Sequence, residues 1–136
     1  MTIDTKKAFE LKSSDFIEVS ESTNLESRQN FSVVWTAAPS LPYFRGHFPE
    51  NPILPAVAII DATVSFLRQR IANPMIEISE LVNCKFTGVI VPSEKLVIKY
   101  SLKRCGDVSL ECQSTWHPAE TLEQKVVSLH IKLKES

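Results

Sequence analysis

The sequence lacks the features that mark secreted and membrane-spanning proteins. It has 3 cysteines in 136 residues, and Cys84, Cys105 and Cys112 show neither a C-x-x-C pair nor the spacing of a zinc site, so we interpret them as reduced thiols. No 18 apolar residues run together, which argues against a membrane-spanning helix. The segment from Met1 to Leu11 lacks the apolar core of a secretory signal. We therefore expect a cytoplasmic protein.

A surplus of charge of one sign is also missing. The chain has 15 basic and 16 acidic residues, a formal net charge of −1, and no block of lysines that would attract phosphate backbones or anionic membranes. We expect no nucleic acid and no membrane as partner. The length suits a single domain over residues 1–136, which buries roughly two thirds of its unfolded surface and needs neither disulfide nor metal to hold its core.

Alternating apolar and polar residues predict several strands. The first two are a short strand over 15–21 and a half-buried strand over 31–36. Four more stretches follow over 76–86, 96–102, 108–116 and 127–133. Because each of these four is apolar on one side only, we expect an antiparallel sheet in which they form a meander.

A single long helix is predicted over residues 56–71, between the second and third strands. Pro55 suits its first turn, and Asn73 with Pro74 ends it. Its first three turns are apolar almost all round, which is typical of a helix buried inside its domain. A sheet wrapped around one central helix buries every apolar face, so the predicted fold class is α+β.

Among the three histidines, His47 stands out. His130 lies on the polar side of the last strand and is interpreted as solvated, and His117 as a turn residue beside Pro118. His47 lies in a proline cluster that fixes the backbone, and an imidazole held there suits proton abstraction near neutral pH. A turn histidine bonded to a backbone carbonyl is the simpler interpretation of this segment alone.

Asp61 is the second candidate, because it interrupts the apolar helix. An unpaired carboxylate there is strongly destabilising unless it is protonated, hydrogen-bonded or facing a pocket. Burial favours the protonated form of a carboxyl group, so Asp61 could act as an acid. The structural alternative is a partner on the same helix, Arg68 or Ser65.

The segment that joins these two candidates resembles a known family. The run from Gly46-His47-Phe48-Pro49 to Pro55-Ala56, with an acid 14 residues after the histidine, is similar to the active-site segment of the β-hydroxyacyl-acyl-carrier-protein dehydratases. The Asp and the Pro-Ile-Leu-Pro run are similar to the branch that contains the aryl-polyene dehydratases. The resemblance implies the hot-dog fold, an antiparallel sheet wrapped around one long central helix.

The resemblance also implies roles for individual residues. His47 would remove the α-proton of a 3-hydroxyacyl thioester, and Asp61 would help the 3-hydroxyl leave as water. The backbone N–H of Ala56 would stabilise the charge that develops on the thioester carbonyl. The implied substrate-binding residues are Gly46, Phe48, Pro55, Ala56 and Ser65. The elimination needs no metal and no cofactor.

Two residues depart from the family's pattern. Ala56 stands where the family usually has Gly, and its methyl group could crowd the substrate. Ser65 stands where many members carry Gln, and its shorter side chain could leave Asp61 oriented by another group.

The same resemblance implies partners. The histidine of one subunit and the acid of another would share a site, so at least a homodimer is expected. The substrate would arrive on an acyl carrier protein, with Arg45, Arg68, Arg70 and Lys85 as candidates for a basic rim. Two alternatives stay open, a non-catalytic hot-dog subunit of a hetero-oligomer and an acyl-thioesterase, although His47 argues against the latter. The same thioester would occur in fatty acid, polyene and polyketide assembly.

Overall fold

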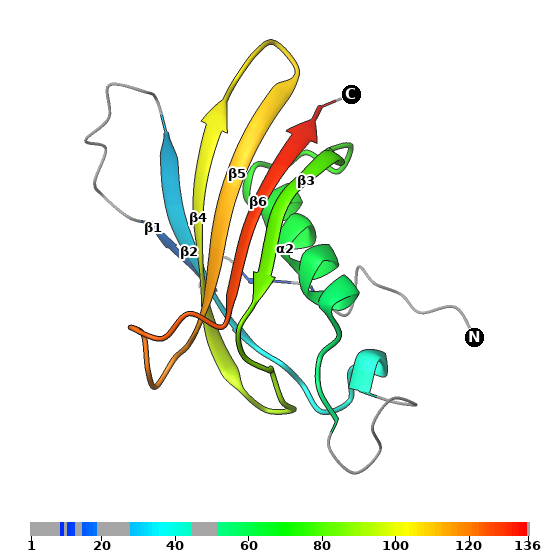
Figure 1. Ribbon diagram of the computed structural model, residues 1–136. Helices are drawn as coiled ribbons and strands as arrows, with labels where there is room; N and C mark the ends of the chain where they lie inside the picture. Colours follow the sequence, from blue (N-terminus) through cyan, green and yellow to red (C-terminus); the bar gives the residue numbers. More distant parts are fainter. Residues whose placement is uncertain (1–8, 10, 13–14, 19–27, 45–51, 136) are drawn as a thin grey trace.

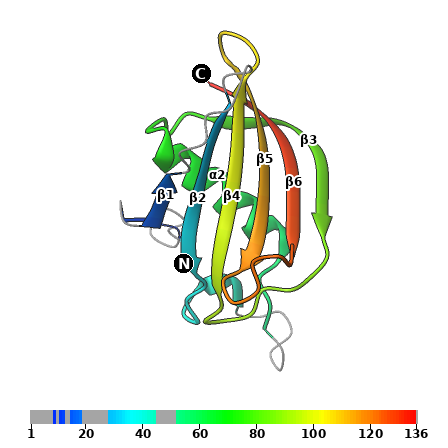
Figure 2. The same cartoon turned by 90° about the vertical axis from the view of Figure 1, so that its left-hand side faces the viewer.

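A computed structural model describes residues 9, 11–12, 15–18, 28–44 and 52–135. Its described strands form one antiparallel sheet in the order β1-β2-β4-β5-β6-β3, and α2 lies against one face of this sheet (Figures 1 and 2). The elements in chain order are β1 (Phe16–Glu18), β2 (Gln29–Thr36), the 3-10 helix η2 (Pro42–Phe44), α2 (Ala56–Arg70), β3 (Glu77–Phe86), β4 (Lys95–Arg104), β5 (Ser109–Pro118) and β6 (Val127–Lys134). The expected sheet with one main helix is confirmed.

The predicted order of the strands is wrong in one respect. Strands β4, β5 and β6 are consecutive neighbours, but β3 pairs with β6, and β2 takes the place beside β4. The link over 87–94 crosses the end of the sheet to connect β3 with β4 (Figure 2). The alternating pattern could not show this, because it specifies which face a residue occupies and not which strand lies beside it.

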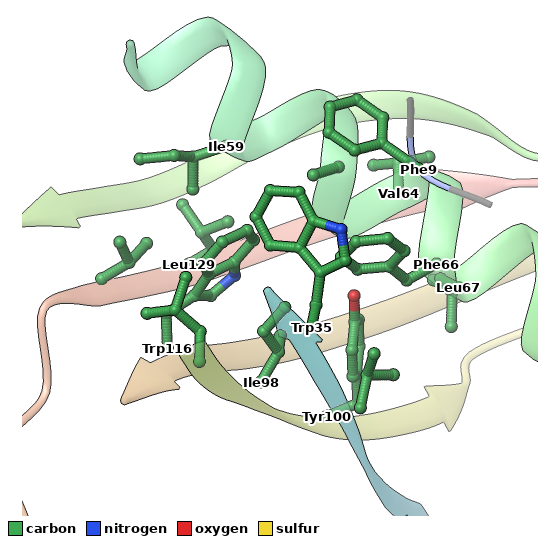
Figure 3. Packing of buried hydrophobic residues seen from close by; sticks show 14 of the residues in the cluster. Phe9, Trp35, Ile59, Val64, Phe66, Leu67, Ile98, Tyr100, Trp116 and Leu129 are labelled. Atoms are coloured by element: carbon green, nitrogen blue, oxygen red, sulfur yellow. The ribbon is translucent and has the colours of Figure 1, made fainter. Parts of the chain in front are cut away.

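The core lies between α2 and the concave face of the sheet, and aromatic rings fill its centre (Figure 3). Phe66 of α2 packs against Trp35 of β2 with 5.6 Å between ring centroids, and Phe9 contacts both rings at 5.8 Å. Trp116 of β5 meets Trp35 edge to face at 5.9 Å. Contacts of this kind contribute about 0.5–1.5 kcal/mol beyond the area that they bury.

Thr63 connects α2 to two strands through buried hydrogen bonds. The Trp116 indole N–H donates to the Thr63 hydroxyl (3.0 Å), which donates to the Ile59 carbonyl (2.8 Å). The Tyr100 hydroxyl donates to the Thr63 carbonyl (2.7 Å), and burial raises the pKa of Tyr100 well above its ordinary value. Because these groups are buried and all paired, they fix which side of α2 faces the sheet.

This orientation of α2 about its own axis leaves one flank of the helix uncovered in the single chain. Val57 is 71% exposed, and Ile60 and Asp61 are half-buried. The prediction that the helix is buried all round therefore holds for its sheet-facing side only. An apolar residue that contacts a second subunit has the same sequence signal as one in the core.

Two histidines differ from their predictions. His117 is 6% exposed at the end of β5, with its ring nitrogens hydrogen-bonded to Thr115 (2.8 Å) and to the Gln124 carbonyl (3.1 Å). Burial, followed by the charge of Lys99, lowers the pKa of His117, so the ring is a neutral structural group. His130 is half-buried and paired with Glu111, and this hydrogen bond lowers the pKa of Glu111.

The three cysteines are free thiols, as predicted. Burial raises the pKa of Cys112 to about 12, which keeps this thiol protonated. In the part of the chain that the structure describes, no helix is long and apolar enough to cross a membrane.

Replacing Thr63 with Val should destabilise the protein by about 1–3 kcal/mol, because the buried Trp116 N–H loses its acceptor while the shape of the side chain is kept. Thr36→Val, at an exposed position at the end of β2, is the matched control and should stay within about 0.5 kcal/mol of the wild type. Urea unfolding followed by Trp fluorescence measures both. Equal stability of the two variants would contradict the role assigned to Thr63.

Candidate active site

A cavity of ≈ 400 Å³ lies along the uncovered flank of α2, beside the start of β3. It extends along the helix from Val57 to Arg68, which corresponds to about 16 Å at 1.5 Å per residue. Its walls are largely apolar, with a few polar groups placed among them, as is usual for small-molecule sites. The lining residues are Tyr43, Val57, Ile60, Asp61, Val64, Arg68, Glu77 and Ile78.

Asp61 lines this cavity together with Tyr43, which comes from η2. Burial raises the pKa of Tyr43, and the negative charge of Asp61 and the tendency of the phenol to hydrogen-bond this carboxylate raise it further. Of the environments expected for a carboxylate in an apolar helix, the structure shows a pocket.

The two partners proposed for Asp61 on its own helix are engaged elsewhere. Arg68 donates through Nε to the Ile76 carbonyl (2.8 Å), at the turn between α2 and β3. Ser65 is hydrogen-bonded by the Gln69 side chain, with 3.4 Å between Nε2 and Oγ. The same Gln69 amide donates to the Phe9 carbonyl (2.8 Å), so it ties Ser65 to the packing of the core.

The N-terminus of α2 opens beside the same cavity. The Ala58 and Ile59 N–H groups both donate to the Pro55 carbonyl (3.0 and 3.1 Å). The N–H groups of Ala56 and Val57 precede these first helical bonds, and the first turn contains no acidic residue. This end of the helix carries a partial positive charge and can stabilise negative charge on a ligand.

The described residues cover part of the predicted site. Pro55, Ala56, Asp61 and Ser65 all lie at or within α2. Gly46, His47 and Phe48 lie outside the described residues, as does Arg45. Among the described residues, no group of three or more His, Cys, Asp or Glu side chains is arranged to hold a metal ion.

Tyr43 is the residue that the sequence analysis missed. It lies between Pro42 and Phe44 in the proline cluster, 18 positions before Asp61. No helical or strand spacing relates the two positions, because their contact joins two separate elements. The signal that could have pointed to it is the rarity of tyrosine, since Tyr43 is one of 2 in the chain.

The profile of the ApeI-like proteins, described as ApeI dehydratase, matches residues 22–124. The chain belongs to the ApeI-like dehydratase family. This match contains the cavity, α2 and the segment around His47, and it confirms the resemblance to the hot-dog dehydratases.

Other similar proteins agree with the ApeI-like assignment. The 3-hydroxyacyl-[acyl-carrier-protein] dehydratase FabZ of Brucella ovis is 30% identical over 97 residues, which are 65% of this chain and 62% of that protein. The FabZ of Caldanaerobacter subterraneus subsp. tengcongensis is 26% identical over 93 residues, 64% of this chain and 66% of that protein. The ApeI-like chain thus matches less than two thirds of the length of these relatives.

Solved structures show the same fold. A protein from Erwinia carotovora subsp. atroseptica has a TM-score of 0.68 at 24% identity, with 88% of this chain and 92% of that chain covered. A chain of the dehydratase heterocomplex ApeI:P from Xenorhabdus doucetiae has a TM-score of 0.60 at 25% identity, with 79% and 94% covered. The fluoroacetyl-CoA-specific thioesterase FlK has a TM-score of 0.61 at 12% identity, with 78% and 84% covered, which shows a shared fold alone.

Proposed function

We propose that the protein is a cytoplasmic dehydratase that converts 3-hydroxyacyl-[acyl-carrier-protein] thioesters to trans-2-enoyl thioesters in fatty acid, polyene or polyketide chain elongation. The observation that carries this proposal is the position of Asp61, whose carboxylate lines an apolar cavity beside the N-terminus of α2 in a chain of the dehydratase family. A fatty or aryl acyl chain fits such walls, and the carboxylate provides the polar chemistry.

The proposed reaction divides the work among three groups. His47 takes the proton from Cα, and the electrons of that C–H bond form the new double bond. Asp61 delivers a proton to the 3-hydroxyl group, so that the C–O bond breaks and water leaves. The N–H of Ala56 donates to the thioester oxygen, where negative charge develops. Gly46, Phe48, Pro55 and Ser65 remain the proposed substrate-binding residues.

Mass spectrometry of the products tests this function directly. The pure protein, given a 3-hydroxyacyl thioester of an acyl carrier protein, should yield a thioester lighter by one water. His47→Ala and Asp61→Asn should each lower turnover by about 10²- to 10⁴-fold, because each removes a proton-transfer group. Asp61→Asn should not destabilise the fold, since a neutral amide costs less to desolvate than a carboxylate.

The other outcomes of the same experiment separate the alternatives. Release of the free acid would identify a thioesterase. The absence of any product would support a non-catalytic subunit of a hetero-oligomer. The similar ApeI:P structure is a heterocomplex, and this observation favours the non-catalytic subunit as the second candidate function. Full activity of both single variants would contradict the proposed mechanism.

We also propose that a second subunit covers the flank of α2 by joining its sheet to β3. In the described part of the chain β3 pairs on one side only, with β6, so its other edge is open. Ile78, Leu81 and Phe86 are in register with buried residues of β6 and so face the helix side of the sheet, yet they are 38–47% exposed. Open apolar edges of this kind are typical of subunit interfaces.

A charge placed on this edge should separate the subunits. Leu81→Arg should give a monomer by light scattering at micromolar concentration, and turnover should fall with the fraction of dimer. Val108→Arg is the matched control, because Val108 is 46% exposed against 47% for Leu81 but lies next to the β4–β5 turn. A Leu81→Arg variant that stays dimeric would contradict an interface at β3.

Carrier-protein binding is the remaining part of the proposal. Arg68 lines the cavity and can contribute positive charge there. Lys85 is exposed on β3 but is in register with Ser128, so it faces the side of the sheet opposite the helix. Arg70 instead lies 5.1 Å from the centroid of the Phe31 ring, on the side of the helix that faces β2. Of these three charges, an acidic carrier at the cavity would therefore meet that of Arg68 first.

A further inference from the structure

We propose that Tyr43 is the positioning residue of Asp61, holding one carboxylate oxygen so that the other is directed at the leaving hydroxyl of the substrate. This inference rests on the proposed dehydratase function and assigns to the same site a residue outside its proton-transfer pair.

The first support is that Tyr43 is itself held in place. Its ring stacks on the Phe9 ring with 5.7 Å between centroids and 9° between planes. Phe9 is 0% exposed and packs edge to face against Trp35 and Phe66. The phenol group therefore extends from the aromatic core to the cavity that Asp61 also lines, and the stacking holds its ring in place.

The second support is that Asp61 needs an orienting group and its own helix does not supply the expected one. Ser65 is bonded by Gln69, and Arg68 directs its Nε at the Ile76 carbonyl. A carboxylate on an otherwise apolar helix face can rotate about its χ angles unless a donor fixes it. Tyr43 of η2 lines the same cavity as Asp61, and its hydroxyl can be this donor.

The third support is chemical. A phenol hydroxyl has one proton to donate, so it occupies one of the carboxylate oxygens and leaves the other for substrate. Because burial and the charge of Asp61 raise the pKa of Tyr43, the phenol stays protonated and remains a donor at neutral pH. Tyr43 does not transfer a proton in this scheme, and its contribution is geometric.

Removing the hydroxyl tests the inference. Tyr43→Phe keeps the ring that stacks on Phe9 and should lower kcat by about 10- to 100-fold with KM nearly unchanged, because the proton donor is misplaced while the acyl cavity is kept. Tyr100→Phe is the matched control, since it removes the other phenol hydroxyl of the chain, which bonds the Thr63 carbonyl. Tyr100→Phe should lower the stability measured by urea unfolding and leave kcat nearly unchanged.

A double variant shows whether Tyr43 acts through Asp61. Adding Tyr43→Phe to Asp61→Asn should change the residual turnover by less than about twofold, because the group to be positioned is already lost. Wild-type kcat in Tyr43→Phe, or the same decrease in both backgrounds, would overturn the inference. If the wild type dehydrates and Asp61→Asn does not, such a result leaves the proposed function intact.

A titration tests the contact without any activity. The chain has 2 tyrosines, and the buried Tyr100 ionises at far higher pH, so the first phenolate seen by ultraviolet absorbance belongs to Tyr43. In Asp61→Asn this first transition should move to lower pH, toward the ordinary value of 10.0, because the nearby negative charge is removed. An identical transition in wild type and variant would overturn the contact even if the protein has no dehydratase activity.

Discussion

The buried hydrogen bonds of Thr63 decide which side of α2 faces the sheet, and the candidate site depends on that rotation. Trp116 and Tyr100 bind Thr63 from two strands, so the helix cannot turn about its axis without breaking buried bonds. Asp61 lies two residues earlier, about 200° around the helix. The same contacts that pull Thr63 into the core therefore direct Asp61 away from the sheet and into the cavity.

Much of this fold could be predicted from residue periodicity, and the exceptions have physical reasons. The helix ends within a residue of its expected boundary, because Pro55 and the Asn73-Pro74 pair limit it on both sides. The place of β3 beside β6 could not be predicted. Alternating apolar and polar residues specify which face of the sheet a side chain occupies, but they do not specify which strand lies beside it. The exposed flank around Val57 has the sequence pattern of a core, because apolarity alone does not distinguish a core from a subunit interface.

The candidate site was predictable only where its chemistry is local in sequence. Asp61 could be found because a carboxylate in an apolar helix is conspicuous, and His47 because of the motif around it. Tyr43 could not, since it comes to the cavity of Asp61 from a separate element, η2, and follows no local spacing. Helical spacing places Ser65 one turn after Asp61, but Gln69 at the next turn binds the Ser65 hydroxyl.

We propose that Asp61 completes a dehydratase site with His47 of a second copy of the chain. The most direct measurement is the activity regained when inactive His47→Ala and Asp61→Asn dimers are mixed and allowed to exchange subunits. With random pairing in an equal mixture, half of the dimers are heterodimers, and each heterodimer has one intact site of two. We therefore expect about a quarter of the wild-type dehydration rate. If mass spectrometry shows that subunits have exchanged and no dehydration is regained, the site is not shared between two subunits.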